Sequence, residues 1–233
     1  MSFRPEVVPA AEEQTEAGAL RASDGRVPGR RGRATRQRLL EQTAEMLTST
    51  SYRELKVVDI ARGAGTSPAT FYQYFPDVEA AILVIAEEMA LTGAARLSGL
   101  VREHPWKGRA AWTTSLGLVE GFMAFWEEHR PLIRVVDLAT EEGDPRFRRV
   151  RVGLLNELTD ALAEVVDGLR KAGRQPADLD PMATAGVLVS MLAHVAAHRY
   201  GFEFWGIRSD DLERSMARIV YTTVTGQKPP AGA

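Results

Sequence analysis

The chain of 233 residues contains no cysteine, which excludes disulfide bonds and thiolate metal sites. This absence fits the reducing cytoplasm, where we expect the protein to act. Histidine is also scarce, and His194 and His198 form the one pair with the i, i+4 spacing that could bind a metal from one helix face. Because no further ligand is identifiable near them, we expect core or interface histidines and no metal site.

The motifs of common catalytic sites are missing as well. The sequence has no P-loop, no Gly-x-Gly-x-x-Gly after a strand, no Gly-x-Ser-x-Gly and no His-Glu-x-x-His. A carboxylate-bridged metal bundle would need Glu-x-x-His pairs on facing helices, and none occurs. We therefore expect no catalytic residues, no enzymatic activity and no cofactor.

Long apolar runs are few. The longest, residues 182–197, contains a serine and a histidine and is shorter than a bilayer-spanning helix requires. The first twenty residues carry four glutamates and no apolar block, so we expect neither a signal peptide nor a transit peptide. With 45% hydrophobic and 26% charged residues, the composition predicts a soluble globular protein with no membrane partner.

Helical periodicity, by contrast, runs through most of the chain. Apolar residues recur at i, i+3 and i+4, and no alternating strand pattern or internal repeat occurs. Apart from the segment described next, the predicted helices span residues 35–49, 78–102, 107–129, 131–143, 145–172, 181–200 and 210–225. The sequence thus predicts an all-α fold of about nine helices.

Residues 56–79 predict two short helices joined by a tight turn. The helical spacing of the first helix stops at Gly65, a residue that can adopt the positive φ of a sharp turn. Ser67 can cap the second helix, and Pro68 suits its first position. In that helix Phe71 and Phe75 share one face for packing, and the other directions carry Thr70, Tyr72, Gln73 and Tyr74. We interpret this segment as a helix-turn-helix, which places its second helix in the DNA major groove.

A local basic segment precedes this motif, although the formal net charge is only −2. No acidic residue interrupts its six arginines, which are Arg26, Arg30, Arg31, Arg33, Arg36 and Arg38. Alone, such a run is as consistent with a disordered solvated tail as with phosphate contact; directly before a helix-turn-helix, phosphate contact is favoured. We expect residues 1–33 to form a disordered basic arm.

The run AGTSPATFYQYF, preceded by an amphipathic helix and followed by PDVEA at the start of a long helix, resembles the N-terminal domain of TetR-family transcriptional repressors. The resemblance implies an N-terminal three-helix DNA-binding domain over residues 34–80. It also implies a C-terminal helical ligand-binding and dimerisation domain over residues 81–225. Residues 226–233 would be a disordered tail.

By this resemblance, the second helix and its turn contact double-stranded DNA through Thr66, Ser67, Pro68, Ala69, Thr70, Tyr72, Gln73 and Tyr74. We assign Gln73 to a base edge, where an amide can pair with adenine, and Tyr72 to a phosphate together with Thr66 and Ser67.

The basic segment adds backbone contacts. We expect Arg33 and Arg36 to clamp phosphates, and Arg30 and Arg31 to reach a minor groove. The family usually has a lysine near the start of the fourth helix, where this chain has Val78. We hypothesise that the arginines compensate for the missing contact.

Residues 181–200 are rich in small side chains, and residues 210–225 carry an apolar stripe. Packing within one subunit would explain both. A homodimer is the alternative that the resemblance favours, because the family dimerises through its two C-terminal helices and helix-turn-helix proteins commonly read paired half-sites.

The C-terminal part is also rich in aromatic residues, whose usual place is the core. A cavity between helices could instead bind a small hydrophobic effector. The predicted lining is Met89, Trp112, Phe122, Met123, Trp126 and Leu155.

These features together predict a repressor that binds a palindromic operator as a homodimer and is released by a small hydrophobic effector. Two alternatives remain open. One is a helix-turn-helix activator or architectural protein without a ligand, and the other is a helical interaction module that does not bind DNA.

Overall fold

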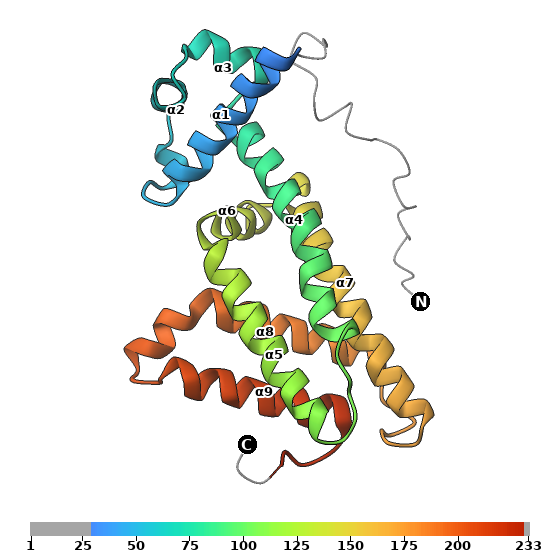
Figure 1. Cartoon of the computed structure of the whole chain (residues 1–233). Helices are drawn as coiled ribbons and strands as arrows, with labels where there is room; N and C mark the ends of the chain where they lie inside the picture. Colours follow the sequence, from blue (N-terminus) through green and yellow to red (C-terminus); the bar gives the residue numbers. More distant parts are fainter. Residues whose placement is uncertain (1–28, 231–233) are drawn as a thin grey trace. The chain divides into compact units, whose positions relative to one another are not determined.

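The computed structural model describes residues 29–230, and within this range it contains nine α-helices, one short 3-10 helix and no strand (Figure 1). The predicted all-α fold is confirmed. The helices fall into two compact units, the first ending at Ile85 and the second beginning at Ala86.

The first unit contains three helices around a small core, followed by the start of a fourth. Leu39, Ile60 and Phe71 are completely buried there. The elements are α1 (Arg30–Leu47), the 3-10 helix (Tyr52–Glu54), α2 (Val57–Gly63), α3 (Pro68–Tyr74) and the beginning of α4 (Val78–Arg102).

Helix α1 begins at Arg30, earlier than the expected start near Thr35. The Arg33 amide donates to the Gly29 carbonyl (2.9 Å), which closes the first helical turn. Arginine and alanine favour helix, so the end of the arginine run extends α1 instead of forming an arm. The rest of the predicted disordered basic arm, residues 1–28, lies outside the described residues.

The turn between α2 and α3 follows the predicted chemistry. Gly65 has a φ of 66°, its amide donates to the Arg62 carbonyl (3.1 Å), and the Thr66 amide donates to the Ala61 carbonyl (2.8 Å). This pair of bonds is a Schellman motif, which satisfies the last carbonyls of α2. The Ser67 Oγ then accepts from the Thr70 amide (3.2 Å) and caps α3.

The second unit contains the rest of α4 and five further helices. These are α5 (Gly108–Glu128), α6 (Arg130–Glu141), α7 (Pro145–Lys171), α8 (Pro181–Phe204) and α9 (Ser209–Thr225). Helix α5 lies beside α8 and α9, and α7 packs against α6 and α8 (Figure 1). Leu118, Phe122, Leu158, Leu162 and Val220 are completely buried in this core.

Both predicted Asp-Pro starts are confirmed. The Asp144 carboxylate accepts from the Arg146 amide (2.8 Å) at the start of α7, and the Asp180 carboxylate accepts from the Ala183 amide (2.7 Å) at the start of α8. At the end of α9, Gln175 donates to the carbonyls of Thr223 and Val224. Of the predicted tail over residues 226–233, the last three residues lie outside the described part.

Helix α8 is longer than its apolar run suggested. With 24 residues, most of them apolar, it is the one helix within residues 29–230 that could cross a membrane by length and composition alone. The apolar run, residues 182–197, is shorter than the helix because α8 continues past Ala197 to Phe204. Core helices of globular proteins have the same length and composition, but only 33% of the most apolar 18 residues of α8 is buried within the chain, so α8 leaves much apolar surface uncovered.

Candidate nucleic-acid interface and ligand groove

Helix α3 has one packed side and one open side. The rings of Phe71 and Phe75 are buried, with centroids 5.5 Å apart. Of the predicted DNA-binding residues, Thr66, Thr70 and Tyr74 are half-buried, and the exposed ones are Ser67, Pro68, Ala69, Tyr72 and Gln73. The structure therefore presents the predicted contact residues on one short, capped helix and the turn that precedes it.

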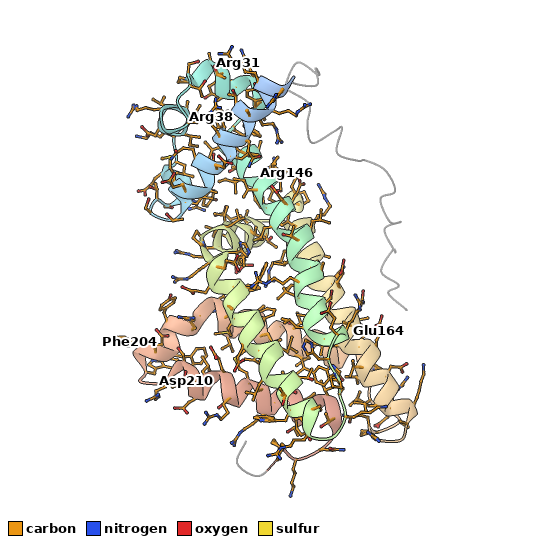
Figure 2. The ribbon with its side chains drawn as sticks, viewed as in Figure 1. Arg31, Arg38, Arg146, Glu164, Phe204 and Asp210 are labelled. Carbon is orange, nitrogen blue, oxygen red and sulfur yellow. The ribbon has the colours of Figure 1, made fainter. Side chains whose placement is uncertain are left out.

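Arg38 helps to hold this unit together, a role that the sequence analysis missed. Its Nε donates to the carbonyl of Ala64 at the end of α2 (3.4 Å), and its Nη2 donates to Thr35 Oγ1 (3.1 Å). Figure 2 shows Arg38 on α1. The side chain thus links α1 to the residue just before the turn that leads into α3.

Arg36 is not on the surface with the other arginines. It is 9% exposed, and its guanidinium lies over the ring of Phe75, 5.2 Å from the centroid. The phosphate clamp that we predicted for Arg36 must be corrected, because this side chain packs inside the first unit. Arg30, Arg31 and Arg33 are exposed on the first turn of α1, where Figure 2 labels Arg31.

The residues predicted to line an effector pocket do not all gather around one space. Phe122 and Trp126 stack on each other, with centroids 5.1 Å apart, and Met89 and Met123 are buried. Trp112 instead meets Tyr221 of α9 edge-on at 5.9 Å. Only Leu155 of this set lines the groove described next.

A groove of about 870 Å³ runs between α6, α7 and α8 and is lined mostly by polar side chains. Its charged and ring side chains come from all three helices: Arg130, Arg134 and Asp137 from α6, Arg151 from α7, and His194 and His198 from α8. Arg151 Nε lies 2.6 Å from Asp137 Oδ1. Burial raises the pKa of Asp137, although the Arg151 charge opposes this change. No sequence motif predicts this groove.

The rings of His194 and His198 stack with centroids 4.2 Å apart, and His198 Nδ1 lies 2.9 Å from the carbonyl of His194. Within the part of the chain that the structure describes, no group of three or more histidine, aspartate or glutamate side chains could hold a metal ion. Both rings belong to the α8 side of the groove.

Two family models match the chain. Residues 39–80 match "Bacterial regulatory proteins, tetR family", and residues 97–231 match "Tetracyclin repressor-like, C-terminal domain". A curated relative, the HTH-type transcriptional regulator EthR of Mycolicibacterium smegmatis, is 24% identical over 216 residues, which cover 92% of this chain and 98% of the relative.

Solved structures share the fold at low identity. A protein of unknown function from a Rhodococcus species has a TM-score of 0.64 at 21% identity, covering 82% of this chain and 95% of that one. The regulator FadR of Bacillus subtilis, solved in complex with stearoyl-CoA, has a TM-score of 0.60 at 16% identity, covering 82% and 98%.

Proposed function

The chain belongs to the TetR family of DNA-binding transcriptional regulators, a non-enzymatic family, and we propose that it is a homodimeric repressor. It binds a palindromic operator in double-stranded DNA and leaves it when a small hydrophobic effector binds. The observation that carries the proposal is the open side of α3, which presents Tyr72 and Gln73 from a helix fixed by the Gly65 turn.

In this proposal α3 of each subunit enters the major groove, and the two copies lie one helical turn apart, roughly 34–36 Å along the operator. Gln73 reads a base edge, and Thr66, Ser67 and Tyr72 bind phosphates. Arg30, Arg31 and Arg33 add backbone and minor-groove contacts from the first turn of α1. The neighbouring residues Pro68, Ala69, Thr70 and Tyr74 complete the contact surface.

Helices α8 and α9 supply the proposed dimer contact. Val187 on α8 is 70% exposed, and Met182 and Ile219 are also exposed apolar residues of these two helices. A second copy related by two-fold symmetry would cover them with the same surface. This also accounts for the largely unburied apolar surface of α8.

The effector proposal is supported by the buried aromatic side chains of α5. A ligand that shifts the stacked rings of Phe122 and Trp126 changes how α5 packs in its unit. A ligand that binds one arrangement better than the other shifts the population between them, which can lower affinity for DNA. The relative FadR was solved with stearoyl-CoA, a ligand with a long apolar chain.

Gel-shift titration of the wild type on the DNA upstream of its own gene tests the DNA-binding part. We expect binding that weakens steeply with salt and is lost in a Tyr72→Ala, Gln73→Ala double variant that retains its circular dichroism spectrum. Undiminished binding by that variant would refute the assignment of α3. Titration of small apolar compounds into the complex then separates a ligand-controlled repressor, which dissociates, from an activator or architectural protein, which does not.

A further inference from the structure

The groove between α6, α7 and α8 contains hydrogen-bonding groups that the chain itself does not satisfy. Thr140 Oγ1 and Arg151 Nη1 are buried atoms with no hydrogen-bond partner within residues 29–230. A buried polar group without a partner is costly, so such groups usually meet water or a ligand. A guanidinium nitrogen can only donate and a hydroxyl can donate, so both atoms suit an acceptor oxygen.

The wall of the groove also carries an excess of positive charge, with three arginines against two carboxylates. Arg134 has no ion-pair or hydrogen-bond partner among the residues that the structure describes, and Arg130 only lies over the ring of Tyr200, 4.1 Å from its centroid. Of the two groove carboxylates, Asp137 pairs with Arg151. Glu141 lies seven residues after Arg134 on α6, a separation of about 10 Å along the helix axis.

Apolar surface adjoins these charged groups. Leu138 and Leu155 line the same groove. The guanidinium of Arg151 lies over the ring of Trp126, 5.4 Å from its centroid. Arg151 therefore contacts both the groove and the stacked aromatic pair in the core of the unit.

We propose that this groove binds the anionic head group, a carboxylate or a phosphate, of a small molecule with an apolar body. Arg134 supplies the unpaired charge, and Arg151 Nη1 and Thr140 Oγ1 supply the buried donors. The apolar body lies against Leu138 and Leu155. That the bound molecule is also the effector rests on the proposed function, whereas its binding in the groove does not.

Calorimetry of the DNA-free protein tests the site with a matched pair of probes, octanoate and octan-1-ol, which share an apolar chain and differ in charge. We expect octanoate to bind at least about tenfold more tightly, because a hydrogen bond to a charged group typically contributes that much. Octyl phosphate in place of octanoate distinguishes a phosphate site from a carboxylate site.

Three variants locate the binding. Arg134→Gln should weaken octanoate about tenfold, and Thr140→Val should weaken it several-fold while raising the melting temperature, because it removes a buried unsatisfied hydroxyl. Arg148→Gln, which removes an exposed arginine of α7 outside the groove, should leave binding unchanged.

Equal binding of the acid and the alcohol, unchanged affinity in Arg134→Gln, or no measurable binding of octanoate or octyl phosphate would overturn the groove assignment. None of these outcomes affects the proposed repressor, which fails instead if the wild type does not bind its operator. If octanoate binds through Arg134 but leaves the operator complex intact, the groove stands and its role as the effector site is refuted.

Discussion

Gly65 shows how one residue sets the position of α3. Its φ of 66° is a conformation that side chains with a Cβ rarely adopt, although a Cβ at this position would meet no atom within 4 Å. A Gly65→Ala variant should therefore lose about 1 kcal/mol of unfolding free energy through backbone strain alone.

Chemical denaturation of Gly65→Ala and of a matched control, Gly117→Ala, measures this loss of unfolding free energy. Gly117→Ala in α5 also meets no atom within 4 Å, but it has ordinary helical φ and should gain up to about 1 kcal/mol from helix propensity. If Gly65→Ala were as stable as the wild type, the turn would not depend on the positive φ.

The exposed arginines of α1 make a second prediction. If Arg31 and Arg33 bind phosphates, Arg31→Gln and Arg33→Gln should each lower the slope of log affinity against log salt by about one unit. Fluorescence anisotropy with labelled operator at several salt concentrations measures the slope. Arg214→Gln, an exposed arginine of α9, should leave it unchanged, and an unchanged slope in all three variants would remove the arginines from the interface.

Arg36 illustrates where prediction from the sequence failed at this scale. The composition of the arginine run favours an arm, although the helical period of α1 continues back to Arg30. Arg36 precedes Leu39 by three positions and Leu40 by four, so a helix that starts at Arg30 places it on the core stripe. The aromatic partner Phe75 lies on another element, and the sequence does not reveal such a contact.

Helix boundaries were predicted well where local chemistry defines them. Asp144-Pro145 and Asp180-Pro181 begin helices, and the Gly65 turn ends one, because caps and turns depend on neighbouring residues. The end of α8 was predicted too early, near residue 200. The i, i+4 pair of Arg199 and Glu203 (3.7 Å) spans Gly201, and the helix continues to Phe204.

The cap of α7 gives a prediction on pH. The side-chain hydrogen bond from Arg146, together with that from its backbone, lowers the pKa of Asp144 from 3.8 to about 2. The native state therefore binds this proton less readily than the unfolded chain, so Asp144 stabilises the fold above about pH 4 and loses that effect as the pH falls towards 2.

As the pH is lowered from 5 to 2, the melting temperature should consequently fall less steeply in Asp144→Asn than in the wild type. The exposed Asp160 of the same helix provides the control, since Asp160→Asn should retain the wild-type slope. Parallel curves for the wild type and Asp144→Asn would contradict the assigned cap.

At the scale of the whole molecule, self-association through α8 and α9 is the main expectation. Val187→Asp places a charge on the most exposed apolar side chain of α8 other than Phe204. A charge buried at a two-fold contact meets its own copy, so the variant should sediment as a monomer and bind the operator at least about tenfold more weakly.

Leu91 on α4 is also strongly exposed, at 77%, but lies outside α8 and α9. Leu91→Asp should therefore remain dimeric in the same sedimentation experiment. A dimeric Val187→Asp variant, or a monomeric wild type, would place the dimer contact elsewhere or exclude it.

The groove could not be predicted from sequence because it is assembled at this scale. Its lining comes from three helices, and Arg134, Arg151 and His194 are separated by many residues of ordinary amphipathic pattern. Single-sequence periodicity shows which side chains face inwards, but it does not show which helices are neighbours. The predicted aromatic set shows the same limit, because Trp112 and Phe122 lie on one helix and pack against different partners.

The most direct test of the central claim is selection of binding sites from random duplex DNA by the purified protein. Two copies of α3 that read successive major grooves should enrich a two-fold symmetric motif with half-site centres about 10 base pairs apart. Gln73→Ala should relax the preference at one position in each half-site, whereas Gln37→Ala, which removes an exposed amide of α1, should not. Enrichment of no motif, or of an identical motif by Gln73→Ala, would contradict the account.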